Sequence, residues 1–108
     1  MIECKDGLFH LKNNALSCLL RVNRYGLLEQ VHFGAPVESE DVEALCPQPG
    51  LGWGSSLLLN DKDPGSCADA MALAWSGSGR GDFRESPLEM DGMSTNFSYV
   101  NHRVLDAL

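Results

Sequence analysis

The sequence has few basic residues and no long apolar run. Only eight of its 108 residues are Lys or Arg, against 15 Asp or Glu, which gives a formal net charge of -7. Affinity for a phosphate backbone comes from Lys and Arg side chains that displace counterions, so this composition disfavours nucleic acid as a partner. No apolar stretch approaches the roughly 20 residues that span a bilayer, so we expect no membrane-spanning segment.

Closely spaced cysteines are also missing. The four cysteines lie at long intervals, at Cys4, Cys18, Cys46 and Cys67. Without a Cys-x-x-Cys pair, neither a zinc site nor a redox motif is indicated, and we expect no metal and no other cofactor. The first six residues include acids where a secretory signal has a basic stretch followed by an apolar run. We therefore expect a cytoplasmic protein with reduced thiols rather than two disulfides.

Apolar residues alternate along several stretches of the chain. They recur at every second position from Leu8 to Leu11 and from Leu16 to Val22, and the extended pattern resumes from Leu27 to Phe33. A period of two is typical of β-strands. Because the turn residues 23–26 separate two of these stretches, the sequence predicts a three-stranded antiparallel meander. Residues 96–104 alternate again and are predicted to form a further strand.

Between these strands the pattern changes. Residues 38–45 favour a short helix with Ser39 as its N-cap, and the acids near its start suit the positive end of the helix. Most of the stretch from Gly50 to Gly65 is rich in Gly, Pro and Asp, which indicates a long loop. The sequence thus predicts an all-β protein, an antiparallel β-sandwich with a long Gly/Asp-rich loop and at most one or two short helices. Its length allows one domain at most.

No catalytic or metal-binding motif is complete. Asp61 and Asp63 begin like a calcium loop, but Ala72 stands where that loop needs a bidentate Glu, so an acidic turn is the favoured interpretation. The three histidines lie far apart in the sequence, and the sequence alone does not identify a Ser-His-Asp triad that includes any of them. A glycosidase needs two carboxylates across a sugar bond, and no pair stands out among the acids of the loops. The residue pattern alone therefore identifies no catalytic or metal-binding site.

Three blocks of sequence support a more specific interpretation. Residues 8–34 contain Leu-Phe-His-Leu-Lys-Asn, Leu-Arg-Val and Tyr-Gly-Leu-Leu-Glu-Gln-Val-His-Phe-Gly, residues 79–87 read Gly-Arg-Gly-Asp-Phe-Arg-Glu-Ser-Pro, and residues 97–104 read Phe-Ser-Tyr-Val-Asn-His-Arg-Val. In this order and spacing they resemble the start of α-galactosidases of glycoside hydrolase family 36. That family has a Phe-His-Leu strand, a Gly-x-Gly-Asp-(Phe/Tyr)-Arg-x-Pro type signature and a Phe-x-Tyr-x-x-His-Arg-Ile strand.

The resemblance implies a domain organisation and an activity. Family members have an N-terminal β-supersandwich, a central β/α barrel and a small C-terminal β domain, and residues 1–108 would be a partial N-terminal β-sandwich domain without the catalytic barrel. The family hydrolyses terminal α-galactosides with retention, using two barrel Asp residues, one in a Lys-x-Asp context. Lys5, Lys12 and Lys62 have no Asp two places later. The chain alone is thus predicted to lack catalytic residues and to be inactive.

The resemblance also implies where this chain would meet substrate. In tetrameric family members a loop of the N-terminal domain reaches into a neighbouring subunit's active site, and the matching stretch here runs from Gly50 to Asp63. Trp53 would stack on a sugar face, and Asp61 or Asp63 would bind its hydroxyls. The alternative is a buried Trp and solvated acids. The implied partners are α-galactosides, through the intact enzyme, and further copies in a homo-oligomer.

The remaining signature residues are expected to be structural rather than to bind substrate. They are Gly81, Asp82, Phe83, Arg84, His102 and Arg103. Because part of a sandwich exposes a strand edge and an unpaired apolar face, the isolated chain is expected to aggregate or dimerise. A second interpretation stays open, in which the chain is a stand-alone carbohydrate-binding or interaction module of the β-sandwich type.

Overall fold

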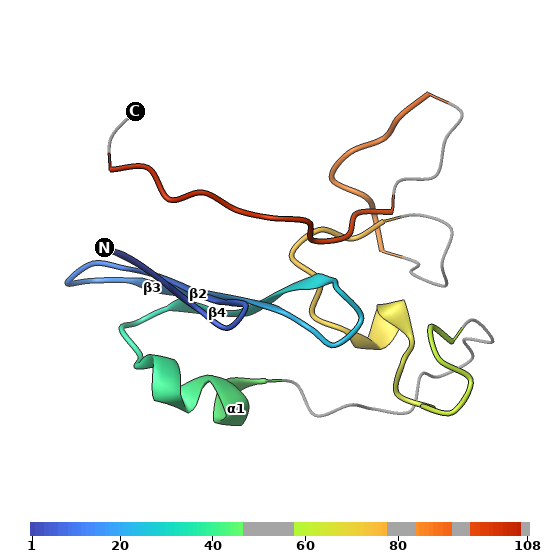
Figure 1. Ribbon diagram of the computed structural model, residues 1–108, viewed down its shortest axis with the longest axis horizontal. Coiled ribbons are helices and arrows are strands. Elements are labelled where there is room, and N and C mark those ends of the chain that lie inside the picture. The colour runs from blue at the N-terminus through green and yellow to red at the C-terminus, as the bar shows by residue number, and fades with distance from the viewer. Residues whose placement is uncertain (47–57, 78–83, 92–95, 107–108) are drawn as a thin grey trace.

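A computed structural model describes residues 1–46, 58–77, 84–91 and 96–106 (Figure 1). Its centre is a four-stranded antiparallel sheet in the order β1-β2-β3-β4. The strands are β1 (Ile2–Lys5), β2 (Leu8–Lys12), β3 (Ser17–Val22) and β4 (Leu28–Gly34). The predicted meander is confirmed as β2, β3 and β4. Strand β1 was not predicted, because its four residues, Ile-Glu-Cys-Lys, alternate between apolar and polar but are too few to establish a period of two.

A two-residue turn joins β1 to β2. Asp6 has a φ of 50° and Gly7 a φ of 77°, and Lys5 pairs directly with Leu8 across the turn. Positive φ at both central residues is the geometry of a type I′ hairpin turn, whose twist matches that of the flanking strands. Asp-Gly is a favoured dipeptide in this turn, so the sequence did carry a signal for the hairpin.

Strand register separates the sheet into two faces. Glu3 pairs with His10, and His10 pairs with Leu19. Arg21 pairs with Glu29 next to the β3–β4 turn, and a β-bulge between Leu19 and Leu20 shifts the register by one residue farther along the strands. Paired residues share a face, so these registers define a polar face that carries Glu3, His10, Ser17, Leu19, Arg21 and Glu29. The same registers define an apolar face that carries Cys4, Phe9, Leu11, Cys18, Leu20 and Phe33.

Different segments cover these two faces. Figure 1 shows α1 (Val42–Leu45) and the C-terminal segment, residues 96–106, on opposite sides of the sheet. Before α1 comes a 3₁₀ turn, η1 (Ser39–Asp41), so the predicted short helix is present. Its N-cap is Glu38 rather than Ser39, which corrects the prediction. Glu38 has an extended backbone, and its N–H donates to the Asp41 carboxylate at 3.4 Å.

The C-terminal segment crosses the apolar face without joining the sheet. Its one backbone hydrogen bond to another part of the described chain runs from Tyr99 N to Gly26 O, at 2.7 Å. The predicted strand over residues 96–104 is therefore wrong for the described residues. Side chains hold the segment instead: the His102 ring meets Phe9 edge-on with 4.7 Å between ring centroids, and Tyr99 Oη lies 2.7 Å from His102 Nδ1.

The edge of β4 is extended by a short stretch that follows a second 3₁₀ turn, η2 (Ala68–Ala70). Gln30 N donates to Ala72 O, and Ala74 N donates to Leu28 O, both at 2.9 Å. Leu73 thereby forms an isolated antiparallel bridge with Glu29. These bonds fix the position of residues 70–72 beside the polar face, where the candidate site lies.

The buried core is small. Among the described residues, the buried hydrophobic side chains are Phe9, Leu19, Cys67 and Ala68. By contrast, Phe33 on the apolar face is 67% exposed. No second sheet covers this face in the described part of the chain. The molecule is thus a small β-rich fold with one short α-helix, and none of its described helices is long and apolar enough to cross a membrane.

Candidate functional site

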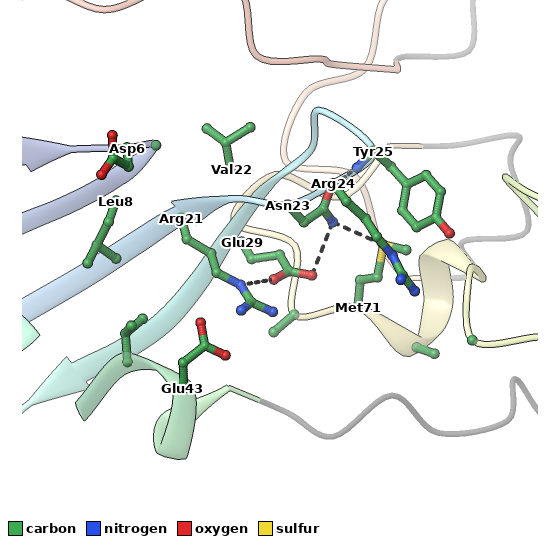
Figure 2. A pocket seen from close by; sticks show the side chains of 15 residues that line it. Asp6, Leu8, Arg21, Val22, Asn23, Arg24, Tyr25, Glu29, Glu43 and Met71 are labelled. Atoms are coloured by element: carbon green, nitrogen blue, oxygen red, sulfur yellow. Dashed lines mark hydrogen bonds and ion pairs between the residues drawn. The ribbon is translucent and has the colours of Figure 1, made fainter. Parts of the chain in front are cut away.

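A pocket of about 440 Å³ lies between the polar face of the sheet, α1 and residues 70–72 (Figure 2). Arg21 and Glu29 from β3 and β4 form its floor, and Glu43 of α1 stands opposite them. Leu8 and Met71 are among the apolar side chains that line it. The pocket therefore combines both charge signs with apolar walls.

An ion pair forms the floor of the pocket. Arg21 Nε donates to Glu29 Oε2 at 2.7 Å, and Asn23 Nδ2 donates to Glu29 Oε1 at 3.1 Å. Both carboxylate oxygens are thereby satisfied, as they must be for a residue that is only 5% exposed. Burial lowers the pKa of Arg21, but the hydrogen bond and charge of Glu29, together with the nearby charges of Cys46 and Glu43, outweigh it and raise this pKa above its ordinary value. The guanidinium therefore stays charged.

Two groups of the pocket remain open to a ligand. Within the described chain, neither the terminal nitrogens of Arg21 nor the carboxylate of Glu43 has a hydrogen-bond partner. Figure 2 shows the Glu43 carboxylate directed towards the side of the pocket where Arg21 lies. No ion pair joins the two residues. Hydrogen-bond donors and acceptors thus stand on opposite walls of one pocket.

Asp63, one of the predicted sugar ligands, connects its loop to the β3–β4 turn. Its Oδ2 accepts hydrogen bonds from Tyr25 Oη and the Arg24 guanidinium, and its Oδ1 accepts one from Gly65 N at 3.1 Å. The hydrogen bond from Tyr25 contributes most to lowering the pKa of Asp63. Partial burial opposes this effect, while the Gly65 amide and the Arg24 charge add to it. Both oxygens of the carboxylate are therefore occupied within the chain.

The other predicted substrate-proximal residues are not brought together. Asp61 is exposed on the same loop, and Trp53 lies outside the described residues. The structure thus places Asp63 in a loop contact, and the sugar-binding role of Asp61 and Trp53 stays a prediction.

The described signature residues lie in two places. Arg84 donates to Met71 O at 2.7 Å and to Ala68 O at 2.8 Å, which holds its segment to the end of η2. His102 packs on Phe9, and Arg103 beside it is exposed. Gly81, Asp82 and Phe83 lie outside the described residues.

Strand pairing produces a second polar cluster that sequence reasoning missed. His10 Nε2 lies 3.0 Å from Ser17 Oγ, and His10 Nδ1 lies 4.0 Å from Glu3 Oε2. The order of acid, imidazole and hydroxyl resembles a hydrolytic triad. However, Ser17 is only 1% exposed, and its hydroxyl oxygen accepts a hydrogen bond from Val37 N at 3.2 Å. The cluster therefore fastens the chain before α1 to the sheet, and a substrate cannot reach the hydroxyl.

The pocket itself was also missed, although the sequence held a signal for part of it. Arg21 and Glu29 are equally distant from the centre of the turn near Tyr25, and such residues face each other in a hairpin when no bulge lies between them and the turn, as is the case here. Glu43 could not be located in this way, because its position depends on how α1 packs. Within the described residues, no group of three or more His, Cys, Asp or Glu could hold a metal ion, and all four cysteines are free.

Comparison with known proteins does not assign the chain. No protein-family model matches it, and no curated protein matches it at a significant level.

Proposed function

We propose that the chain is the N-terminal, non-catalytic segment of an α-galactosidase of glycoside hydrolase family 36. The observation that carries the proposal is a contact between two of the blocks that resemble this family. Tyr99 and His102 of the third block pack their rings against Phe9 of the first block. Residues that recur together in a family are expected to pack together in its fold, so this contact supports treating the blocks as one unit.

The apolar face, which the C-terminal segment covers only in part, gives further support. Phe33 is largely exposed and Leu11 is partly exposed on the same side of the sheet. A sheet with one apolar face is stable only when that face packs against another layer. In the proposed β-supersandwich a second sheet supplies this layer. The 108 residues would then be part of the sandwich, and the catalytic carboxylates would lie in a barrel elsewhere in the enzyme.

In this role the segment would contribute to oligomerisation and to a neighbouring subunit's active site. Asp61 suits the second task better than Asp63, because Asp63 is already bonded to Tyr25, Arg24 and Gly65. The segment would act through the intact enzyme, on terminal α-galactosides, without a cofactor and in the cytoplasm.

The coding sequence after the codon for Leu108 tests this proposal. We expect the reading frame to continue into a β/α barrel that contains an Asp in a Lys-x-Asp context. A stop codon at that point, within a complete transcription unit, would contradict the proposal.

The pocket favours one alternative, a stand-alone carbohydrate-binding module of the β-sandwich type. A ligand-sized pocket built from β3, β4 and α1 needs no partner domain. This alternative predicts a stop codon after Leu108 and sugar binding by the isolated chain. The enzyme-segment proposal predicts a continuing reading frame and does not require sugar binding by the isolated chain, so the reading frame separates the two.

A further inference from the structure

We propose that the pocket between the polar face and α1 binds a compact, neutral, polyhydroxylated molecule of the monosaccharide class. The inference goes beyond the enzyme-segment proposal, which places no ligand in this pocket, and it specifies the ligand class of the carbohydrate-binding alternative. Its volume of about 440 Å³ lies within the range of small-molecule sites, which is roughly 300–1,000 Å³.

The open polar groups match hydroxyls. A hydroxyl both donates and accepts hydrogen bonds. The terminal nitrogens of Arg21 can only donate, and the ionised carboxylate of Glu43 can only accept. A ligand between them must therefore present acceptors to one wall and donors to the other. Neighbouring hydroxyls on one ring do this without carrying charge.

The existing ion pair strengthens this assignment. Glu29 fixes Arg21 through its Nε, so the direction of the two terminal nitrogens is set before a ligand arrives. Preorganised donors lose less entropy on binding than free ones. Glu29 itself is poorly suited to bind a cation, because Arg21 and Asn23 already donate hydrogen bonds to both of its carboxylate oxygens.

The charges around the pocket disfavour ionic ligands. Arg21 and Arg24 contribute two positive charges to the lining, while Asp6, Glu29 and Glu43 contribute three negative ones. An anion drawn to Arg21 would also approach Glu43, and a cation drawn to Glu43 would approach Arg21. A neutral ligand avoids both repulsions.

The apolar walls suit the remaining surface of a sugar. Leu8, Val22 and Met71 line the pocket beside the charged groups. Sugars carry C–H faces as well as hydroxyls, and contact with these side chains removes both surfaces from water.

Amide NMR spectra of the isotope-labelled 108-residue chain, titrated with D-galactose, test the proposal. We expect saturable shifts of amides that line the pocket, such as those of Gly7, Val22 and Glu43, with a dissociation constant on the order of 1–10 mM for a half-open site. Sodium sulfate at matched ionic strength is the control for a simple anion site and should leave these amides unshifted.

Glu43→Ala is the decisive variant. Glu43 has no ion pair or hydrogen bond within the described chain, so its loss should leave the fold intact while weakening galactose binding about tenfold. Glu40→Ala, in the adjacent exposed turn η1, removes the same charge outside the pocket and should bind like the parent chain. Arg21→Lys keeps a positive partner for Glu29 but loses the forked donors, so it should also weaken binding.

Three results would overturn the proposal. One is the absence of saturable pocket shifts up to about 100 mM galactose, well above the expected dissociation constant. Another is displacement of galactose by sulfate, which would make the pocket an anion site. The third is unchanged binding in Glu43→Ala. None of these results affects the reading-frame test, so the pocket and the enzyme-segment proposals fail separately.

Discussion

At the residue scale, the clearest chemical contact is the one between Asp63 and the turn that joins β3 to β4. Sequence reasoning recognised Asp63 as a loop acid with turn-forming capacity, but it could not find Tyr25 and Arg24 as its partners, because they lie 38 and 39 positions away in the chain. A contact of that sequence separation depends on how the loop folds back over the sheet. The same limit applies to the Arg84 hydrogen bonds and to the Glu43 wall of the pocket.

Acid is expected to release the Asp63 contact. The pKa of Asp63 is lowered in the folded chain, chiefly by the hydrogen bond from Tyr25. Its contribution to stability is therefore present above the unfolded-state pKa of about 4 and is lost as the pH falls through the lower folded-state pKa. Urea unfolding across the acid range measures this directly. Asp63→Asn should remove that part of the pH dependence. If the free energy of unfolding of Asp63→Asn fell in acid just as it does in the parent chain, the assignment would be contradicted.

The same contact is expected to weaken in alkali. The pKa of Tyr25 is raised, first by its hydrogen bond to Asp63 and also by partial burial. Its contribution is present below the unfolded-state pKa of about 10 and is lost as the pH rises through the higher folded-state pKa. The ultraviolet titration of tyrosine should show one group that ionises late, and Asp63→Asn should return it towards the ordinary range.

Arg84 is expected to be structural. Arg84→Ala removes the hydrogen bonds to the carbonyl oxygens of Met71 and Ala68, and we expect the free energy of unfolding to fall by about 1–2 kcal/mol, because solvent access discounts charged hydrogen bonds of this kind. Arg103→Ala, which removes the same charge from an exposed position, is the control and should change the free energy of unfolding by less than about 0.5 kcal/mol. Equal effects of the two substitutions would contradict the structural role. In an intact enzyme, Arg84→Ala should lower stability or assembly more than substrate affinity.

At the element scale, local signals predicted most of the sheet. The alternation of Leu8–Leu11, Leu16–Val22 and Leu27–Phe33 marks β2, β3 and β4, since each strand has enough residues to show a period of two. The short helix over residues 38–45 was predicted from its acids, although its N-cap is Glu38 rather than the predicted Ser39. Strand β1 is too short for this test, and only the Asp-Gly turn after it indicated a hairpin.

The wrong prediction at this scale has a physical cause. Residues 96–104 alternate like a strand, but alternation shows only that one side of an extended segment is apolar. Whether the backbone pairs depends on a free sheet edge within reach. Here Phe9 and His102 hold the segment across the face of the sheet instead of along an edge.

The turn between β1 and β2 should tolerate only particular residues. Gly7 has a φ of 77°, and Gly7→Ala is expected to lower the free energy of unfolding by about 1–2 kcal/mol because an L-residue is strained in this region. Asp6→Asn, beside it, should be neutral or slightly stabilising because Asn-Gly suits the same turn. Thermal unfolding of both variants measures the difference. A Gly7→Ala protein as stable as the parent would rule out the proposed turn geometry.

At the scale of the whole molecule, the described part of the sheet leaves large apolar side chains exposed. Ile2 on the outer strand β1 and Phe33 on the apolar face are both exposed. An unpaired strand edge and an open apolar face both favour association between chains. The predicted sandwich is not confirmed. The described residues form one four-stranded sheet, whereas a sandwich needs a second sheet packed against it.

Self-association is therefore expected of the isolated chain. Sedimentation velocity at increasing concentration should show dimers or larger species, and Phe33→Ser should shift the distribution towards monomer because it removes the most exposed aromatic side chain of the apolar face. Lys62→Ser, on an exposed loop, is the control and should leave the distribution unchanged. A monodisperse monomer at high concentration would show that the apolar face needs no partner.

The central proposal is that these residues belong to an α-galactosidase without carrying its catalytic groups. Hydrolysis of 4-nitrophenyl α-D-galactoside tests it most directly, measured for residues 1–108 and for the complete product of the reading frame that contains them. We expect no activity from the 108 residues and α-galactosidase activity from the complete product. Activity in residues 1–108, or a complete product without any α-galactosidase activity, would contradict the account.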